Sequence, residues 1–367
     1  MGDSHRTDPE CGRYRAFRLP PPRGGRHGGA MRAPFTAAAV ILLVLVVVPG
    51  WTVEERLPLL QSRAQMNAER VPLDPRDQRR TRVGGLTYLG GVALSSRDPA
   101  FGGFSALAVE GDGFTLLGDG GNIVRFRMGA DWRPRNVIFS YLPAGPGTGW
   151  DKRDRDSESL AVDAAGRMFV SFENTNAIWR YAPGFARAEA LATPAPMADW
   201  SENGGAEALA RLPDGRFVAI SETTFVPRRA WRGSPGTRRR TRDAVIFSGN
   251  PTAPGTRRSR FAYRPFGRHD PADAAALPNG DLVVLDRDFA LPFRWSNRVS
   301  IVPRRAIRAG GVAEGRLVAV LDAPLVHDNF EGLAVTRDGA DTILWLVSDD
   351  NQMPLQRSLL LKFRLER

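Results

Sequence analysis

The stretch ESLAVDAAGRMFVSFE, residues 158–173, decides the fold. Apolar and polar residues alternate on both sides of the turn AAG, and an acid stands at each end of the stretch. Alternation around a short turn that contains glycine is typical of a β-hairpin. The pattern returns in SALAVEGDGFTLLGD from Ser105, EALARLPDGRFVAISE from Glu207, DAAALPNGDLVVLD from Asp273 and EGLAVTRDGADTILWLVSD from Glu331.

The five repeats begin 53, 49, 66 and 58 residues apart, and this spacing predicts an all-β propeller with one four-stranded blade per repeat. Strand-like runs follow each of the first four repeats, but only SLLLKFRLE (358–366) follows the last. We expect GLTYLGGVALS (85–95) to complete the last blade, because an N-terminal strand there closes the ring. Five blades are the simplest count. Six are possible if the long gap hides a blade, whereas a β-sandwich would not explain five repeats.

The composition excludes several protein classes. The chain has 367 residues, 42% of them hydrophobic and 25% charged, so it is not globally disordered. A single cysteine, Cys11, excludes a disulfide framework. The net charge of +11 would suggest a nucleic-acid partner if it were spread over the fold. Most of it lies in one stretch instead, because residues 228–264 hold eleven arginines and one acid. We interpret this stretch as an exposed insertion loop, either solvated or in contact with an anionic surface, which argues against a nucleic-acid partner.

The N-terminal region predicts export. Residues 1–30 are interpreted as a disordered tail before the true start at Met31, and 31–53 as a signal peptide or an uncleaved anchor around the apolar run Phe35–Val48. Residues 54–82 are interpreted as a polar linker and 83–367 as the propeller. We therefore expect a protein that is periplasmic, secreted or anchored to the inner membrane.

The acids at the ends of the repeats are the candidate site. Residues equally distant from a hairpin turn lie opposite each other, so both ends of each repeat should meet at one mouth of the propeller channel. Nine of these ten positions are carboxylates. The predicted pairs are Ser105 with Asp119, Glu158 with Glu173, Glu207 with Glu222, Asp273 with Asp286, and Glu331 with Asp349.

A ring of carboxylates repels itself unless protons or cations neutralise it. Oxygen ligands without cysteine favour a hard divalent cation, with Ca²⁺ ahead of Mg²⁺ and Mn²⁺. Alternatively, the acids only cap hairpin ends in each blade. Weaker candidates for proton transfer are His269 and His327, which precede repeat starts.

We assign roles within the ring as follows. The catalytic candidates are Glu158, Glu207 and Glu331. The metal candidates are Asp119, Glu173, Glu222, Asp273, Asp286 and Asp349. The candidates for holding a substrate phosphate are Arg180 and Arg287.

The repeats resemble the phytase-like β-propeller family, known as "esterase-like activity of phytase". The resemblance rests on FSALAV, DRDSESLAVDAAGRMFVSFE, GGAEALARLPDGRFVAISE, DAAALPNGDLVVLDRDF and NFEGLAV…LWLVSDDN, and covers about residues 84–367. It implies a protein exported from bacteria that hydrolyses phosphoesters, with or without a metal ion. By motif position it implies a site made of Glu158, Glu173, Glu207, Glu222, Asp273, Glu331 and Asp349.

One repeat departs from the pattern. Asp273 stands seven residues before its turn glycine, whereas the other repeats begin eight residues before theirs, so Ala272 takes the equivalent slot. This puts the direction of Asp273 in doubt, although a β-bulge could restore it.

Three functional hypotheses follow. The first is a metal-dependent phosphoester hydrolase acting on a small molecule. The second is a non-catalytic binding propeller whose ring holds a structural ion. The third is a calcium-dependent lactone or carboxyl ester hydrolase. In each case we expect a monomer.

Overall fold

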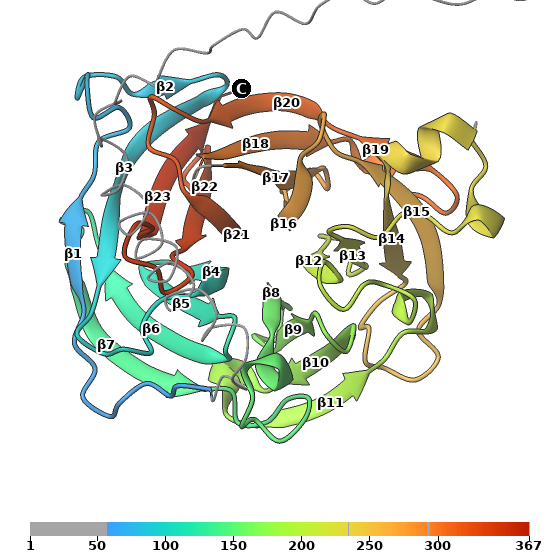
Figure 1. Ribbon diagram of the computed structural model, residues 1–367, viewed down its shortest axis with the longest axis horizontal. Coiled ribbons are helices and arrows are strands. Elements are labelled where there is room, and N and C mark those ends of the chain that lie inside the picture. The colour runs from blue at the N-terminus through green and yellow to red at the C-terminus, as the bar shows by residue number, and fades with distance from the viewer. Residues whose placement is uncertain (1–56, 234, 292–293, 367) are drawn as a thin grey trace, which may run out of the picture. The chain divides into compact units, whose positions relative to one another are not determined.

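A computed structural model describes residues 57–233, 235–291 and 294–366, which form five β-sheets arranged as blades around a central channel (Figure 1). The predicted propeller is confirmed, with five blades. Among the described residues there are strands and short 3₁₀ helices but no α-helix. None of the described helices is long and apolar enough to cross a membrane. The predicted tail (1–30) and the predicted signal peptide or anchor (31–53) lie outside the described residues.

The strands of each blade follow one another from the channel outward. Blades 1 and 2 contain β4 (Phe104–Glu110), β5 (Gly113–Gly118), β6 (Asn122–Met128) and β7 (Pro134–Tyr141), then β8 (Ser157–Val162), β9 (Met168–Phe172), β10 (Ala177–Tyr181) and β11 (Ala188–Ala192). Blades 3 and 4 contain β12 (Ala206–Arg211), β13 (Phe217–Ser221), β14 (Arg242–Phe247), β15 (Arg258–Arg264) and β19 (Val312–Glu314), then β16 (Asp270–Ala276), β17 (Leu282–Ala290), β18 (Arg294–Val302) and β20 (Arg316–Leu321). Six 3₁₀ helices lie in connections: η1 (Lys152–Arg155), η2 (Pro183–Phe185), η3 (Ala195–Met197), η4 (Arg228–Ala230), η5 (Pro235–Arg240) and η6 (Arg304–Ala306).

Blade 5 joins the two ends of the propeller. From the channel outward it contains β21 (Asn329–Asp338), β22 (Asp341–Asp349), β23 (Ser358–Leu365) and the early strand β3 (Leu86–Ser95). β3 pairs antiparallel with β23 over its whole length, as the sequence predicted. Two strands that fall in the predicted linker, β1 (Asn67–Arg70) and β2 (Arg82–Val83), pair with the outer edge of β3, so part of that linker belongs to the blade.

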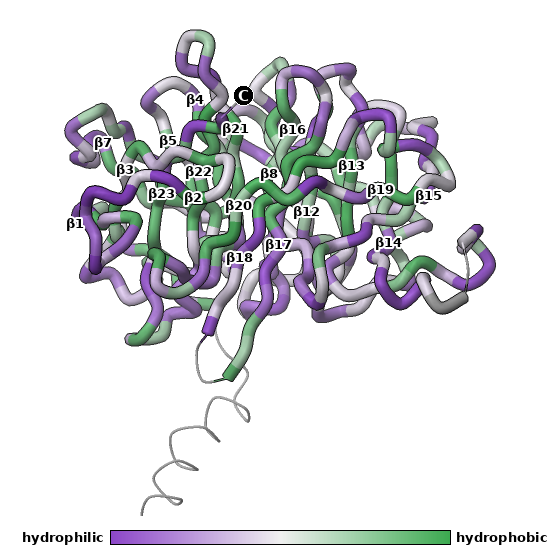
Figure 2. The backbone as a smooth tube through the Cα atoms, turned by 90° about the horizontal axis from the view of Figure 1, so that it is seen from above, coloured by the Kyte–Doolittle hydropathy of each residue, from purple (hydrophilic) through white to green (hydrophobic). Residues whose placement is uncertain are grey.

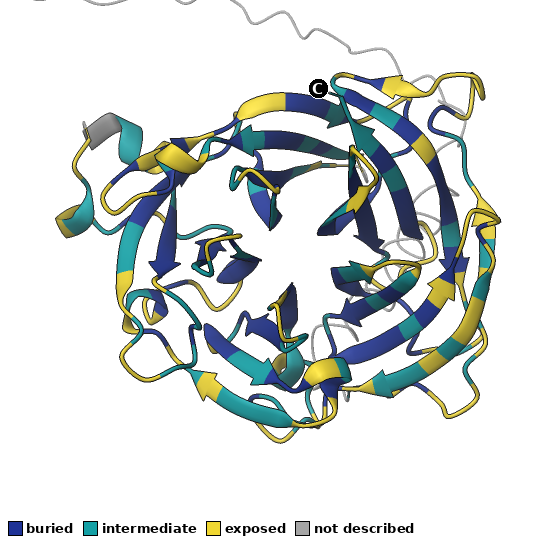
Figure 3. Ribbon diagram, turned by 180° about the vertical axis from the view of Figure 1, so that it is seen from behind, coloured by how far each residue is buried: buried dark blue, intermediate teal, exposed yellow. Residues whose placement is uncertain are grey.

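Five apolar clusters hold the ring together, one between each pair of neighbouring blades. The period of two in a strand explains this arrangement, because successive side chains point to opposite faces of the sheet. On β17, for example, Leu282 and Val284 pack toward blade 3, whereas Val283 and Leu285 pack toward blade 5. Burial is accordingly highest in the inner and middle strands and lowest at the outer rim (Figure 3).

The two ends of the channel differ. At one end, here called the mouth, the inner strands begin and the second strands finish; the opposite end carries the tight turns between them. Two of these turns place Gly166 and Gly215 at φ +74° and +88°, a left-handed conformation that favours glycine. The mouth carries the connections between second and third strands and those between blades.

The arginine-rich stretch 228–264 is not one loop. Its residues 242–247 and 258–264 form β14 and β15, two strands of blade 3. The prediction was wrong here because arginines at alternate positions can sit on a strand beside buried residues such as Val245 and Phe261. The exposed part is reduced chiefly to the β13–β14 connection, residues 222–241, at the mouth.

Candidate active site at the mouth of the channel

Each inner strand begins with a β-bulge. The pairing with the second strand skips one residue in every blade, and a bulge of this kind redirects the extra side chain. The skipped residues are Ser105, Glu158, Glu207, Ala272 and Glu331 in blades 1 to 5.

The ends of the second strands supply a second set of side chains at the mouth. In each blade, one residue at the end of the second strand lies opposite the residue that stands two places before the bulged residue of the inner strand. These residues are Asp119, Glu173, Glu222, Arg287 and Asp349. The predicted pairing of acids is therefore wrong in register: Glu173 lies opposite Asp156, two residues before Glu158.

Blade 4 departs from the prediction at both of its acids. Ala272 occupies the bulge, and the position equivalent to Glu173 holds Arg287 instead of Asp286. Asp286 is fully buried, and both of its carboxylate oxygens lie 2.8 Å from the hydroxyl of Tyr263 in blade 3, which donates to them. The structure does not bring Asp286 to the mouth, because successive strand residues face opposite sides of the sheet.

Asp273 lies below the mouth, inside the channel. Its Oδ1 accepts hydrogen bonds from Ser159 Oγ and the Ala274 N–H, and its Oδ2 accepts one from the Leu333 N–H, all at 2.8 Å. These donors come from three blades, so Asp273 links inner strands. With both oxygens used in this way, the structure does not place it among the metal candidates at the mouth.

Five carboxylates of blades 2 and 3 form two compact groups of three, with one residue common to both. Within each group, one oxygen of every member lies within 4.8 Å of the others. The first group is Asp156, Glu158 and Glu173, and the second is Glu173, Glu207 and Glu222. Glu173 belongs to both, so it occupies a bridging position.

The backbone fixes Glu173 in this position. The N–H groups of Gly204 and Gly205 both donate to its Oε1. Gly204 has φ +94°, and a Cβ atom there would come within 2.3 Å of Thr223 Oγ1 and 2.9 Å of Glu222 Oε2. Glycine is therefore required both for the backbone conformation and for the space beside the carboxylates.

Arg287 connects the second group to blade 5. Its Nη2 donates to Glu222 Oε1 at 3.1 Å, and its Nη1 donates to Asn329 Oδ1 at 2.8 Å and to Glu331 Oε1. These bonds use three of the five N–H groups of the guanidinium. The side chain is only 15% exposed, and although burial acts to lower the pKa of Arg287, the carboxylates of Glu331 and Glu222 raise it, so the guanidinium stays charged.

The remaining side of the mouth holds Asp119 and Asp349. Asp119 forms an ion pair of 2.6 Å with Lys152, and the buried Asp349 accepts hydrogen bonds from the Asn351 N–H at 2.6 Å and from Asn329 Nδ2 at 3.4 Å. In blade 1 the bulged Ser105 donates to the Ser157 carbonyl and offers no charge.

We refer to eight carboxylates at the mouth as the acidic cluster: Asp119, Asp156, Glu158, Glu173, Glu207, Glu222, Glu331 and Asp349. Another carboxylate, Asp270, lies opposite Arg287 and is neutralised by an ion pair with Arg242. Only two cationic side chains, Lys152 and Arg287, contact it among the described residues. Eight carboxylates against two cations cannot all stay ionised in a buried site without further neutralisation.

Burial and mutual repulsion shift the acids toward their protonated forms. Burial raises the pKa of Glu158, Glu207 and Asp349 well above the ordinary carboxyl range, and neighbouring carboxylates add to the effect. Burial also raises the pKa of Asp156 to about 7, with the charge of Glu173 as the next cause. Burial raises the pKa of Glu331 even though Arg287 opposes the shift. Strongly shifted groups gathered in one recess are typical of functional sites.

A pocket of about 460 Å³ opens beside the second group. Its walls include Glu222, Arg287, Glu331, Asn329 and the aromatic pair of Phe289 and Trp295. Because Glu222 and Arg287 also belong to the mouth, this pocket is where a substrate would meet the acidic cluster.

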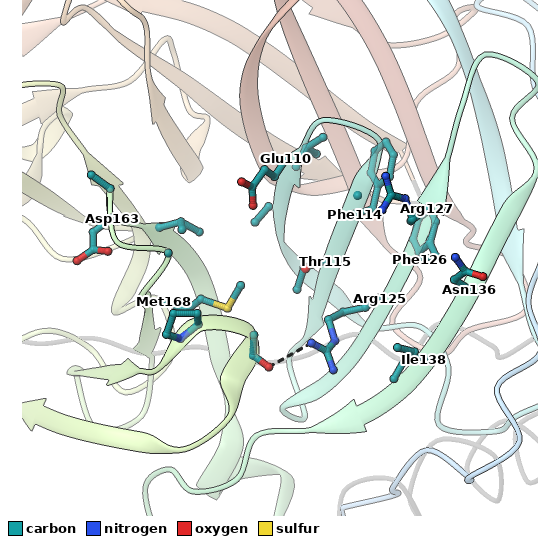
Figure 4. A pocket seen from close by; sticks show the side chains of 18 residues that line it. Glu110, Phe114, Thr115, Arg125, Phe126, Arg127, Asn136, Ile138, Asp163 and Met168 are labelled. Carbon is teal, nitrogen blue, oxygen red and sulfur yellow. Dashed lines mark hydrogen bonds between the residues drawn. The ribbon is translucent and has the colours of Figure 1, made fainter.

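A second pocket, of about 630 Å³, lies at the opposite end of the molecule, between blades 1 and 2 (Figure 4). Phe114, Phe126 and Met168 line it together with Arg125, which donates to the Gly184 carbonyl. None of the acidic cluster lines this pocket, so we do not assign it the chemistry of the mouth.

Other predicted residues lie elsewhere. Arg180 on β10 forms an ion pair with Glu189 on β11, between outer strands, and the structure does not bring it to the acidic cluster. His269 shares a hydrogen bond of 3.2 Å with Ser296, and His327 shares one with the Leu325 carbonyl. Neither histidine contacts the acidic cluster within the described part of the chain.

Sequence reasoning missed Asp156 and Asn329 as site residues. Both stand two places before a bulged acid, in DSE and NFE. That spacing was the available signal, since residues two apart on a strand face the same side.

Comparison with known proteins identifies the family. A search of curated proteins found no match. Among solved structures, the chain is similar to glutaminyl cyclase of Myxococcus xanthus, with 11% identity, a TM-score of 0.41, and coverage of 72% of this chain and 91% of that chain. It is also similar to virginiamycin B lyase of Staphylococcus aureus, with 9% identity, a TM-score of 0.38, and coverage of 82% and 100%. A third is the PQQ-bound aldose sugar dehydrogenase of Streptomyces coelicolor, with 15% identity, a TM-score of 0.41, and coverage of 83% and 99%. Likenesses this distant carry no argument about activity.

The family model described as "Phytase-like: Esterase-like activity of phytase" matches residues 99–352. This range contains all five repeats and every residue of the acidic cluster. The chain therefore belongs to the phytase-like family.

Proposed function

We propose that the protein hydrolyses phosphoesters at the mouth of its channel with the help of divalent cations. The observation that carries the proposal is the bridging position of Glu173 between two groups of three carboxylates, next to a buried arginine. Paired cation sites beside an arginine are suited to phosphoryl transfer, where charge accumulates on the phosphate oxygens.

The donor set fits hard cations. Every member of the two groups offers carboxylate oxygen, and four of the five are buried or nearly so without an ion-pair partner of their own. Asp156, Glu158 and Glu173 would hold one cation, and Glu173, Glu207 and Glu222 a second. Oxygen ligands and the absence of sulfur favour Ca²⁺, with Mg²⁺ and Mn²⁺ as alternatives. When bound, such cations supply Lewis-acid polarisation of the phosphoryl group.

Arg287 would hold the phosphate in the 460 Å³ pocket. Two of its N–H groups are not used by Glu222, Asn329 and Glu331, and a guanidinium binds phosphate oxygens through paired N–H groups. The three contacts fix the plane of the guanidinium before the substrate arrives, so little ordering remains to be done on binding.

Glu207 and Glu331 would move the protons. A water oxygen attacks phosphorus as Glu207 takes one of its protons, and the bond from phosphorus to the alcohol oxygen breaks. Glu331, which lines the pocket, gives a proton to the departing alcohol oxygen, so one proton is taken and one is returned. Burial raises the pKa of Glu331 although Arg287 opposes the shift, and the cation that Glu207 would help to hold would favour the ionised form of Glu207 that a base needs.

We also propose that the protein is exported. The support is the apolar run Phe35–Val48 after Met31-Arg32, which lies outside the described residues. Fusion of residues 31–60 to a reporter that is active only outside the cytoplasm tests this: an inactive reporter contradicts export.

Turnover tests the catalytic proposal. The purified chain should release phosphate from a phosphomonoester or phosphodiester only when Ca²⁺, Mg²⁺ or Mn²⁺ is present. Glu173→Gln should lower kcat by at least about a hundredfold, the scale of losing a central electrostatic group. Glu189→Gln, in the outer ion pair with Arg180, is the matched control and should retain activity. Folded protein that binds cations without any turnover would contradict hydrolysis and favour a binding propeller.

A further inference from the structure

Large apolar side chains protrude from the mouth, around the pocket. Leu291 at the end of the β17–β18 hairpin is 85% exposed, Leu355 in the β22–β23 connection is 74% exposed, and Trp150 in the β7–β8 connection is 67% exposed. The hairpin extends beyond the rest of this face (Figure 2). Single exposed apolar residues are ordinary, so these three become informative only together with the charge and the entry of the chain on the same face.

Exposed arginines lie on one side of the same face, at blade 3. The β13–β14 connection, residues 222–241, exposes Arg228, Arg229, Arg232, Arg239 and Arg240. Its described residues include no exposed acid, and of these five arginines only Arg229 forms an ion pair, with Asp199 at 3.8 Å. The rim of the mouth is thus cationic at the β13–β14 connection, whereas the acidic cluster lies deeper in the channel.

The chain enters the propeller on this face. The Leu57 N–H donates to the Trp150 carbonyl at 2.8 Å. The apolar run ends at Val48, so eight residues separate it from Leu57. Even fully extended, that connection spans at most about 30 Å. An apolar segment held in a bilayer would therefore keep the mouth face close to the lipid surface.

We infer that the mouth face rests on an anionic lipid surface and that the site takes lipid phosphoesters from it. Leu291 and Leu355 enter the lipid interface, and the arginines of the β13–β14 connection contact anionic headgroups. The lipid substrate class rests on the proposed function; the docking does not.

The pocket is arranged for an amphiphilic substrate. Phe289 and Trp295, whose rings are 4.6 Å apart, form the pocket wall on the same hairpin that carries Leu291. An apolar path therefore runs from the exposed tip to Arg287 at the base. The alkyl part of a lipid phosphoester would lie along the aromatic pair while its phosphate reaches the guanidinium.

Site-specific fluorescence tests the docking without any turnover. In a Cys11→Ser background, Leu291→Cys is labelled with an environment-sensitive dye, and Ala164→Cys, exposed at the opposite end, is the matched control. With vesicles of phosphatidylethanolamine and phosphatidylglycerol, the dye at position 291 should shift to shorter wavelength while the dye at 164 stays as in water. Equal behaviour of the two labels, or a shift equally large with phosphatidylcholine vesicles, overturns the inference.

A second measurement tests the substrate class. Leu291→Asp/Leu355→Asp should lower hydrolysis of vesicle-borne phosphatidic acid at least about tenfold, since each buried leucine is worth a decade or more. Hydrolysis of soluble dihexanoyl phosphatidic acid should be unchanged. Equal losses on both substrates overturn the lipid assignment. If the unsubstituted protein hydrolyses neither substrate, the proposed function fails, while the fluorescence still decides the docking.

Discussion

Ser159 of blade 2 donates a hydrogen bond of 2.8 Å to Asp273 of blade 4, across the central channel. Blade 3 lies between these two blades in the ring, so the bond passes over the axis instead of joining neighbours. Ser159 Oγ also accepts from the Leu209 N–H at 2.9 Å, and Asp273 accepts from the Leu333 N–H. Blades 2, 3, 4 and 5 are thereby linked directly beneath the acidic cluster, which gives the mouth a fixed floor.

Replacing Asp273 by alanine should destabilise the propeller. The change leaves buried donors of Ser159, Ala274 and Leu333 without their acceptor, and each unsatisfied buried group costs about 1–3 kcal/mol. We expect a loss of about 3 kcal/mol in the free energy of unfolding, measured by urea denaturation. Asp214→Ala, which removes a half-exposed acid from a hairpin turn, should cost less than about 1 kcal/mol. Equal losses for the two variants would show that the link across the channel contributes nothing particular.

The repeats were sufficient to predict the architecture. Alternation around AAG at 164–166 and DG at 214–215 requires hairpins, and the shortage of strands after Glu331 requires a closing strand from the N-terminus. Both inferences depend on local pattern and on the need to remove sheet edges, which are properties of sequence alone.

The composition of the site was less predictable, because register decides it. A bulge inserts one residue without leaving a mark in the alternation, so the sequence did not show that Glu173 lies opposite Asp156. In blade 4 both predicted acids stand one residue away from the positions at the mouth, so Ala272 occupies the bulge and Arg287 takes the place expected for Asp286. The acid expected to bind a metal thus pairs with Tyr263, and a cation takes its place at the mouth.

The bridging position of Glu173 predicts the stoichiometry of cation binding. Isothermal titration of the unsubstituted protein with Ca²⁺ should reveal two sites. Asp156→Asn and Glu222→Gln each change one group only and should each abolish one site, whereas Glu173→Gln changes both groups and should abolish both. A Glu173→Gln protein that still binds two ions would rule out the bridge.

The backbone of Gly204 predicts a second route to the same loss. In Gly204→Ala the new Cβ would meet Thr223 Oγ1 and Glu222 Oε2, and the residue would be held at φ +94°. We expect a cost of about 1–3 kcal/mol in stability and weaker Ca²⁺ binding at the group of Glu173, Glu207 and Glu222. Gly339→Ala is the matched control, because Gly339 also has positive φ, +58°, but a Cβ there meets nothing within 4 Å. If both variants bind Ca²⁺ equally well, the close approach at Gly204 has no part in shaping the site.

The raised pKa values predict how stability depends on pH. Burial raises the pKa of Asp156 to about 7 and that of Asp286 to about 7, so in the folded protein these carboxyls keep their protons over a range where the unfolded chain has lost them. Their contribution to stability is therefore complete below pH ~4 and is lost as pH rises toward 7, at about 1.4 kcal/mol per pH unit and group. Without divalent cations, the melting temperature should fall between pH 5 and pH 8.

Saturating Ca²⁺ should reduce that pH dependence, because a bound cation stabilises the ionised carboxylates of the acidic cluster. The part due to Asp286 should persist, since that side chain lies away from the mouth, against Tyr263. Differential scanning fluorimetry from pH 5 to pH 8, with Ca²⁺ and with a chelator, measures the pH dependence that Ca²⁺ removes and the part that persists. An identical slope in the two conditions would mean that the cations bind elsewhere or not at all, and a slope of opposite sign would mean that the buried acids are already ionised at pH 5.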